Sequence, residues 1–438
     1  MTDETKHSID DNEMANLSFF GQVYNRFIIE DSYRNQLLNH LEQDSVPHYG
    51  FVFNDNHRIN ENIKHLDSGS YAHVYRLFEP NKMLKFEHKN HIRNPVIIKM
   101  IPLLAEELLQ RLTDFHRISS YNDVHNECII QRTLSQLNGR YQHSDGRIYM
   151  CTTFPRLFRS TLIRGPLGSC FDVQTNNNDD DDNVDDNEEG LPFMNNVSDE
   201  FNLTDQIPQE YMMLVMEDCG LPITDCLQQI KPLACVSIVK QLIIGLMIAE
   251  TVFQFEHRDL HGGNVLVQTT NKTMIHYIMR NRTFSLPSYG CMIKIIDTTF
   301  SRIRIGQTVY HKQLSYLFTS DNLSSSKSEQ DRTYERMNQL VTSNDQHWKQ
   351  YHPQTNVIWI EYIIGKILRL LTPVDGQLAV ESNSNNVKSR TATTNHVIRL
   401  LTNYTKLTDN CSSATELFDK IVAVANRNND DLCRIRFH

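Results

Sequence analysis

The chain changes its residue pattern near residue 218, and this change limits its possible folds more than any other feature. Upstream, "IKHLDSGSYAHVYRLF" (63–78) alternates apolar and polar residues, and "PVIIKMIPL" (95–103) is a short apolar run; both patterns predict β-strands. "YMMLVMEDCG" (211–220) is a further buried strand that ends in a Cys-Gly break, and most of the chain after it has helical patterns. Strands followed by helices predict an α+β protein with two lobes.

The length supports this division, because 438 residues are too many for one small core and domains usually contain about 100–200 residues. We predict an N-terminal extension at 1–60, a strand-rich N-lobe at 61–218 and a helical C-lobe at 219–438. Residues 172–209, rich in Asn, Asp and Glu, have too little apolar area to order themselves. They are predicted to form a disordered acidic insert.

Charge and composition exclude several classes of protein. The net charge is −10, but eight acids in the run 179–189 leave only −2 for the rest, so no basic nucleic-acid-binding surface is indicated. None of the nine cysteines forms a C-x-x-C pair, which argues against a zinc site and favours reduced thiols. The most apolar segment, 234–255, is interrupted by Lys240, Gln241 and Glu250, so we expect a buried helix and no membrane span.

The stretch "FEHRDLHGGNVLVQ" (255–268) crowds ionisable groups in front of an apolar strand. Its last part and "CMIKIID" (291–297) both have strand-like patterns. If the two strands pair antiparallel, the start of the first meets the end of the second. Asp259, Asn264 and Asp297 would then converge on one point.

Oxygen ligands of this kind suit Mg²⁺, which takes one or two carboxylates and completes its shell with water and phosphate oxygens. Asn264 and Asp297 are therefore candidate metal ligands, and Asp259 is a candidate acceptor for the proton of an attacking hydroxyl. Taken alone, each residue also has a structural interpretation: Asp259 would cap a turn, and Asp297 would only end a strand. The predicted convergence of all three favours the catalytic one.

Two charged residues of the N-terminal half need partners. Glu127 lies within the apolar arc of the helix expected in "NDVHNECIIQRTLSQL", and Lys99 lies in an apolar strand. A buried charge is costly without a partner of opposite sign, so we predict that the two side chains pair. A lysine held in this way can offer its ammonium to phosphate oxygens. The alternative is that both side chains reach water unpaired.

These motifs resemble those of protein kinases over roughly residues 63–371. "HRDLHGGN" is similar to the catalytic loop H-R-D-L-x-x-x-N, "PVIIK" to the V-A-I-K strand, and "IIDTT" stands where kinases have D-F-G. The resemblance implies a bilobal protein-kinase-like fold with a strand-rich N-lobe and a helical C-lobe. The loop alone also resembles that of small-molecule kinases of the aminoglycoside and choline type.

Two later stretches resemble the haspin family in particular. "IIDTTFSRI" (295–303) is similar to its Asp-Tyr-Thr segment and the Leu-Ser-Arg that follows, and "WKQYHPQTNVIWIEYIIGKIL" (348–368) is similar to its Trp-x-x-Tyr-His-Pro region. The resemblance implies a monomeric serine/threonine protein kinase whose activation segment needs no loop phosphorylation. It also implies ATP and Mg²⁺ as cofactors, a protein substrate that includes a histone-tail threonine in mitosis, and a location in the nucleus, on mitotic chromatin, and in the cytoplasm. Neither nucleic-acid nor membrane binding is expected.

The resemblance also implies roles for individual residues. Lys99 becomes the phosphate-binding lysine, Glu127 its helix partner, Asp259 the catalytic base, and Asn264 and Asp297 the Mg²⁺ ligands. The implied nucleotide-binding residues are Asp67, Gly69, Val74, Lys99, Met216, Glu217, Cys219, Asn264 and Asp297. His257 is expected to brace the loop and Arg258 to be structural.

Several positions depart from the family pattern. Of the three loop glycines only Gly69 is present, and an aspartate at position 67 puts a negative charge near the phosphates, which predicts a raised KM for ATP. In "LSYLFT", Leu314 and Tyr316 stand where the family has the acidic residues that receive the histone tail. Thr298 replaces a tyrosine and Gly262 a tryptophan. A kinase-fold scaffold with weak or no catalysis is therefore the non-enzymatic alternative.

Overall fold

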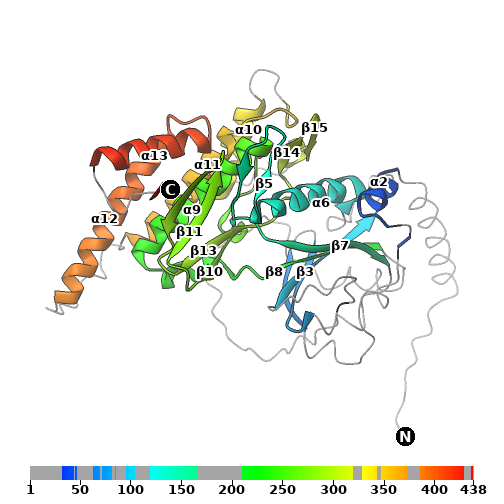
Figure 1. Ribbon diagram of the computed structural model, residues 1–438, viewed down its shortest axis with the longest axis horizontal. Helices are drawn as coiled ribbons and strands as arrows, with labels where there is room; N and C mark the ends of the chain where they lie inside the picture. The colour runs from blue at the N-terminus through cyan, green and yellow to red at the C-terminus, as the bar shows by residue number, and fades with distance from the viewer. Residues whose placement is uncertain are drawn as a thin grey trace, which may run out of the picture. The chain divides into compact units, whose positions relative to one another are not determined.

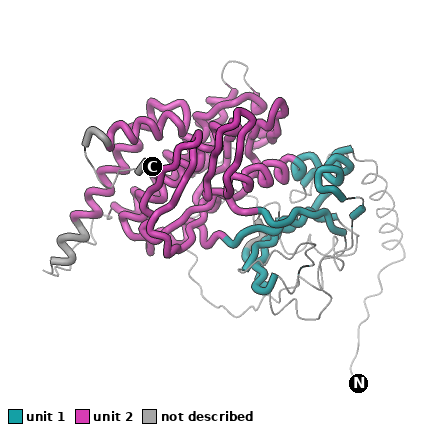
Figure 2. The backbone as a smooth tube through the Cα atoms, viewed as in Figure 1, with its two compact units in different colours: residues 1–125, 157–218 teal, residues 126–156, 219–438 magenta. Residues whose placement is uncertain are grey.

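The structure is a computed structural model, and it divides the chain into two compact units: residues 1–125 with 157–218, and residues 126–156 with 219–438 (Figure 2). The acidic insert predicted at 172–209 and most of the predicted N-terminal extension lie outside the described residues. The residues that the structure describes are 32–43, 45–46, 63–69, 72–80, 84, 95–104, 119–164, 210–318, 328–342, 347–372, 385–428 and 436–437.

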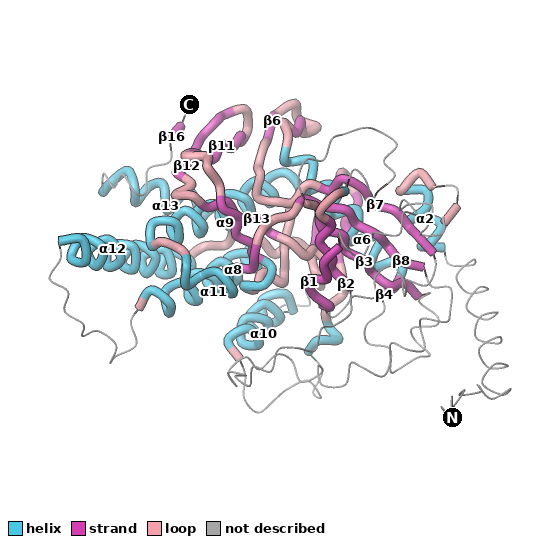
Figure 3. The backbone as a smooth tube through the Cα atoms, turned by 90° about the horizontal axis from the view of Figure 1, so that it is seen from below, coloured by secondary structure: helices cyan, strands magenta, loops and turns pink. Residues whose placement is uncertain are grey.

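Unit 1 is built on a six-stranded, mainly antiparallel sheet, of which Figure 1 labels β3, β7 and β8 and Figure 3 also labels β1, β2 and β4. The strand order is β1-β2-β3-β8-β7, and the short β4 pairs with β3 in parallel. A single helix, α2, precedes the sheet in the described part of this unit. The bounds are α2 (Ser32–His40), β1 (Ile63–Gly69), β2 (Ala72–Leu77), β3 (Val96–Leu104), β4 (Ser119–Ser120), β7 (Leu157–Arg164) and β8 (Glu210–Glu217).

The central strand β3 shows why a lysine is tolerated in an apolar run. Side chains alternate between the faces of a strand, and Val96, Ile98 and Met100 form the fully buried face. Lys99 and Ile97 point to the other face and are only half-buried. Lys99 is therefore not the buried cation that the sequence suggested.

Unit 2 surrounds the long helix α9 (Pro232–Phe253). Pro232 occupies the first turn, where a missing N–H costs nothing, and the side chains of the helix are buried on nearly every side. α9 is the one helix of the described residues that is long and apolar enough to cross a membrane, and its burial inside unit 2 marks it as a core helix, as predicted. It packs against α11 (Gln354–Leu371), α12 (Asn385–Thr408), α13 (Ala414–Asn428) and strand β13.

The other elements of unit 2 are mostly short (Figure 3). They are α6 (Tyr121–Ser135), which begins in unit 1, η2 (Gln136–Asn138), β5 (Tyr141–Gln142), β6 (Ile148–Tyr149), β9 (Leu221–Pro222), α8 (Ile223–Cys226), η4 (Leu227–Gln229), η5 (Gly262–Asn264), β10 (Val265–Thr269), β11 (Met274–Met279), β12 (Arg282–Pro287), β13 (Cys291–Ile295), β14 (Arg302–Ile305), β15 (Thr308–His311), η6 (Ser315–Phe318), α10 (Glu329–Thr342) and β16 (Arg436–Phe437).

The two compact units group one segment differently from the predicted lobes, which remain a prediction. Residues 126–156 were expected in the N-lobe, but they group with unit 2. The reason is hydrophobic: Ile130, Leu134, Leu137 and Phe154 belong to the same buried cluster as the side chains of α9. The second segment of unit 2 begins at Cys219, next to the predicted switch.

Candidate active site

Two paired strands bring the predicted site residues of unit 2 together. β10 and β13 are antiparallel, with Val265 opposite Ile295, as the sequence analysis expects. Immediately beyond this pair, the amide of Ile296 donates to the carbonyl oxygen of Asn264 at 3.0 Å. Asn264 and Asp297 therefore lie at the same end of the strand pair. The hairpin β11–β12, inserted between the two strands, was not predicted.

The catalytic-loop sequence is held in an unusual backbone conformation. Arg258 and Asp297 both have positive φ angles, +69° and +59°. Such values are uncommon for residues other than glycine, and they persist only where surrounding contacts fix the chain. They occur one residue before Asp259 and at Asp297 itself, so the positions of both carboxylates depend on the packing of the loop.

Asp259 is mostly buried, with 16% of its side chain exposed. Its Oδ1 accepts a short hydrogen bond from the hydroxyl of Tyr334 on α10, and its Oδ2 lies 3.4 Å from the amide nitrogen of Asn264. Burial raises the pKa of Asp259 to about 8; the hydrogen bonds from Tyr334 and Asn264 act against this rise, and the charge of Asp297 adds to it. A cation near Asp297 would therefore favour the ionised form of Asp259, the form that accepts protons.

Asn264 and Asp297 have the chemistry expected of Mg²⁺ ligands. The amide nitrogen of Asn264 donates to the backbone oxygen of Asp259 at 2.8 Å, which turns its amide oxygen away from that carbonyl. The described residues contain no group of three His, Cys, Asp or Glu side chains able to hold a metal. A site of one carboxylate and one amide fits a Mg²⁺ ion that takes its other ligands from water and phosphates.

Glu127 is linked to Asp297 through Thr299. The Thr299 hydroxyl lies 2.5 Å from Oδ1 of Asp297 and 3.0 Å from Oε2 of Glu127. One hydroxyl has one proton and can donate to only one carboxylate at a time. Two carboxylates that share one donor favour a nearby cation. Sequence analysis missed Thr299, because a threonine within "IIDTT" carries no signal of this contact.

His257 braces the loop, as the family resemblance implies. Its Nδ1 lies 3.3 Å from the amide of Asp259, and its Nε2 lies 2.8 Å from the carbonyl oxygen of Ile296. The amide must donate, so Nδ1 accepts and Nε2 carries the proton. Burial lowers the pKa of His257 to about 4, which keeps the ring neutral. His257 therefore joins Asp259 to the strand that leads to Asp297.

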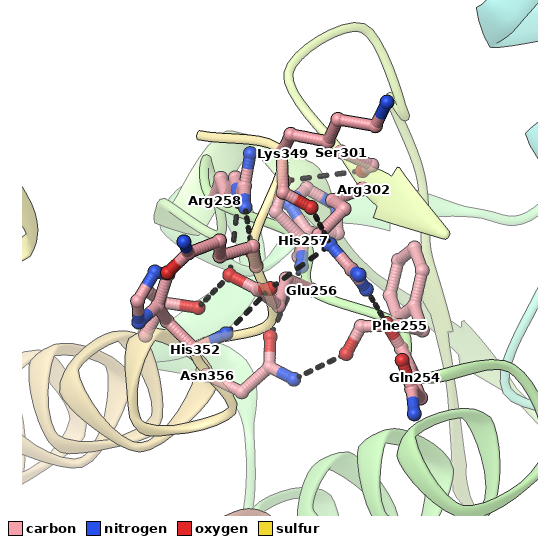
Figure 4. A network of polar contacts seen from close by, with 12 residues as sticks. Gln254, Phe255, Glu256, His257, Arg258, Ser301, Arg302, Lys349, His352 and Asn356 are labelled. Carbon is pink, nitrogen blue, oxygen red and sulfur yellow. Dashed lines mark hydrogen bonds and ion pairs between the residues drawn. The ribbon is translucent and has the colours of Figure 1, made fainter. Parts of the chain in front are cut away.

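A buried carboxylate, Glu256, holds the loop from the other side (Figure 4). Its oxygens lie 3.1 Å from Nε of Arg258 and 3.7 Å from Nε of Arg302, and they accept from the amide of His352 at 2.8 Å and from the hydroxyl of Thr355 at 3.1 Å.

The stretch "WKQYHPQTNVIW" (348–359) also contacts the loop. The guanidinium of Arg258 lies 5.3 Å from the ring centre of Trp348, and the amide oxygen of Asn356 accepts from the amide of His257 at 3.0 Å. The stretch therefore supports the catalytic loop directly. Arg258 is structural, because its charge is paired inside the protein.

The nucleotide-binding residues implied by the resemblance are spread over both units. In unit 1, β1 carries Asp67 and Gly69, β2 carries Val74, and Val74 and Leu214 are the neighbours of Lys99 in the register of β3. Met216 and Glu217 end β8, still in unit 1. Cys219 is buried and belongs to unit 2. The pairing of Lys99 with Glu127 remains a prediction, because these residues belong to different units.

Three departures from the family pattern have structural counterparts. Leu314 is fully buried, and Tyr316 is 44% exposed, so the "LSYLFT" segment offers no carboxylate at either position. Gly262 is buried, and a Cβ there would lie 2.6 Å from a methyl of Thr224, which leaves no room for a tryptophan. Thr298 is buried, and its hydroxyl lies 3.5 Å from the carbonyl oxygen of Glu127.

The strand-rich unit, the helical unit and the loop geometry together define a protein-kinase-like domain. Comparison with known families gives a match over residues 190–418 to the family described as "Haspin like kinase domain". The match covers more than half of the chain, and the chain belongs to this family.

Individual relatives are similar over parts of their length. The chain is 29% identical to "Serine/threonine-protein kinase haspin" of Bos taurus over 205 residues, 46% of this chain and 25% of the bovine protein. It is 24% identical to the haspin homolog of Drosophila melanogaster over 342 residues, 77% of this chain and 54% of the fly protein. It is 32% identical to the Mus musculus haspin over 167 residues, 37% of this chain and 21% of the mouse protein. The chain thus spans about half, or less, of the length of these relatives.

Proposed function

We propose that this protein is a serine/threonine protein kinase that transfers the γ-phosphate of ATP to a hydroxyl of another protein. The observation that carries the proposal is the convergence of Asp259, Asn264 and Asp297 at one end of the β10–β13 pair, in a chain of the haspin-like kinase family. Asp259 accepts the proton of the attacking hydroxyl as the phosphoryl group is transferred.

The other residues bind and orient. Asn264 and Asp297 hold Mg²⁺, which supplies charge neutralisation at the phosphates when bound. Lys99 contributes an ammonium to the phosphates and is paired with Glu127. The segment with Asp67, Gly69 and Val74 covers the nucleotide. The backbone at Glu217 and Cys219 forms hydrogen bonds with the adenine.

The site residues constrain the protein substrate less than they constrain the reaction. Family membership favours a histone-tail threonine, phosphorylated in mitosis by a monomeric enzyme in the nucleus and also present in the cytoplasm. Buried Leu314 and exposed Tyr316 argue against strong recognition of a cationic tail, because neither can neutralise it. A second function, a kinase-fold scaffold, is favoured by one feature, the loss of two loop glycines.

Nucleotide binding separates the enzyme from the scaffold. We expect ATP with Mg²⁺ to raise the unfolding midpoint, since a ligand that binds only the native state at 100 times its Kd adds about 2.7 kcal/mol of stability. Asp297→Asn should lose the Mg²⁺-dependent part of the rise. Asp145→Asn, in an exposed turn, is the matched control. No rise at millimolar ATP with Mg²⁺ would favour the scaffold.

Acceptor mapping tests the substrate. Radiolabelled ATP, Mg²⁺ and the protein are incubated with core histones or with casein, and the labelled residues are mapped by mass spectrometry. Label on a histone-tail threonine would support the family substrate. Label confined to casein would keep the kinase and reject the histone.

A further inference from the structure

The hydroxyl of Tyr334 touches the candidate catalytic base, and sequence analysis assigned it no role. Tyr334 lies on α10, 75 residues after Asp259, and its hydroxyl donates to Oδ1 of that carboxylate. Tyr334 is half-buried and the Asp259 side chain is only 16% exposed, so water has limited access to the contact. The hydrogen-bond partner of the tyrosine hydroxyl is thus the group that must accept the substrate's proton.

Packing fixes the direction from which the phenol approaches. The Tyr334 ring meets the fully buried ring of Trp359 edge-on, with centroids 5.1 Å apart. Two ion pairs tie α10 to α11: Arg336 with Glu361 at 3.0 Å and Arg369 with Glu329. Trp359 lies within the stretch that most resembles the haspin family, so one helix supports both Tyr334 and the loop.

The two oxygens of Asp259 are therefore not equivalent. Oδ1 holds the Tyr334 hydrogen bond, while the nearest donor to Oδ2 is the amide nitrogen of Asn264 at 3.4 Å, long for a hydrogen bond. The same amide nitrogen makes a better bond, 2.8 Å, to the backbone oxygen of Asp259. Oδ2 is therefore the more weakly held oxygen and the one with more capacity to accept from a further hydroxyl.

We propose that Tyr334 is a positioning residue: it anchors Oδ1 of Asp259, so that Oδ2 faces the acceptor hydroxyl and receives its proton. This inference rests on the proposed kinase function and adds to it a residue outside the sequence motifs. The proposed role of Tyr334 is confined to Asp259 and includes no contact with ATP. Its loss should slow the chemical step and leave nucleotide binding intact.

The test is single-turnover phosphoryl transfer by Tyr334→Phe, with casein or core histones as acceptor, whichever the wild-type protein labels. The variant keeps the ring on Trp359 and removes only the hydroxyl. Tyr362→Phe is the matched control. It removes a tyrosine hydroxyl from a ring that also packs on Trp359, with the two ring centroids 5.5 Å apart. All proteins are assayed at a temperature where circular dichroism shows them folded.

We expect Tyr334→Phe to transfer phosphate about 10- to 100-fold more slowly, since a hydrogen bond to a charged group is typically worth a factor of this size. The KM for ATP and the ATP-induced rise in unfolding midpoint should stay within twofold of wild type, a split that a general structural defect would not give. Tyr362→Phe should transfer at the wild-type rate.

An unchanged rate in Tyr334→Phe would overturn the proposal, because Asp259 would then need no anchor. A faster rate would also overturn it, since the phenol would be blocking the base. If the wild-type protein itself transfers no label to any acceptor, the proposed kinase function fails. If the wild type transfers label and Tyr334→Phe does so at the same rate, only the role of Tyr334 fails.

Discussion

At the scale of single residues, the catalytic loop depends on charges that are satisfied inside the protein. Arg258 is fully buried, and Arg302 nearly so; both rely on one carboxylate, Glu256. The loop needs no outside anion to hold Arg258. That the activation segment needs no loop phosphorylation remains a prediction of the resemblance.

Glu256→Gln should destabilise the protein strongly. It leaves two buried guanidinium groups without a carboxylate, and breaking a buried pair in this way costs about 3–5 kcal/mol. Glu361→Gln is the matched control, because it breaks the pair with Arg336, whose side chain is 52% exposed, at a cost of about 1 kcal/mol or less. Urea denaturation gives both free energies of unfolding. Equal losses in the two variants would contradict the structural role of Glu256.

His257 should make the protein acid-sensitive. Burial lowers its pKa to about 4 in the folded state, while the pKa of a histidine in an unfolded chain is about 6.5. Between these values the unfolded state binds more protons, so stability present above pH 6.5 is lost as the pH falls toward 4, by up to about 3 kcal/mol.

The variant His257→Gln isolates this effect, because glutamine does not titrate. The difference in unfolding free energy between wild type and His257→Gln should shrink between pH 6.5 and pH 5. A constant difference for His257→Gln over this range would show that the ring does not gain a proton on unfolding.

At the scale of elements, α2 gives part of the N-terminal extension a structural role. Arg34 donates two hydrogen bonds of 2.9 Å to Glu210 at the start of β8, and Arg164 and Tyr121 bind the same carboxylate. Just after α2, Gln43 pairs with both backbone groups of Leu162 on the edge strand β7. The segment thus fastens to the sheet and covers part of an edge that would otherwise be open to pairing.

Arg34→Ala should therefore lower stability by about 3 kcal/mol, because Glu210 is completely buried and loses a two-bond partner. Gln36→Ala, on the exposed face of the same helix, should change it by less than about 0.5 kcal/mol. Burial acts to raise the pKa of Glu210, but Arg34, Arg164 and Tyr121 lower it below its usual value.

The stabilisation from Glu210 should consequently be present at neutral pH and be lost as the pH falls below the normal titration range of glutamate. The gap between wild type and Arg34→Ala, measured by urea denaturation, should narrow in acid. A gap that is absent at pH 7 would mean that α2 is not bound to the sheet in solution.

At the scale of the whole molecule, the sequence predicted what depends on regular pairing. The α+β class and the convergence of Asn264 with Asp297 follow from strand and helix patterns and from antiparallel register. The family follows from the resemblance of its motifs, such as "HRDLHGGN" and "WKQYHPQTNVIW". The roles of Lys99 and the nucleotide-binding residues stay predictions. Period-two and period-3.6 patterns indicate which residues share a face of a strand or helix, and these predictions need no more than that.

Contacts between distant segments could not be predicted in the same way. Tyr334, Glu256 and Arg34 all have partners far away in sequence, although Glu256 also binds nearby Arg258, and no local pattern marks these contacts. The grouping of residues 126–156 with unit 2 could not be predicted for the same reason, because the apolar face of α6 does not reveal which core receives it. Burial of Lys99 was overestimated, since flanking apolar residues do not show which face of a strand is covered.

The central claim is that Asp259 serves as the base of a phosphoryl transfer. The most direct measurement is transfer of radiolabel from ATP to casein and core histones by wild type, Asp259→Asn and the exposed control Asp225→Asn. We expect wild type and Asp225→Asn to label an acceptor on serine or threonine, and Asp259→Asn to be slower by about 10²–10⁴-fold while still binding Mg²⁺-ATP. Equal labelling by wild type and Asp259→Asn, or none by a wild type that binds nucleotide, would contradict the account.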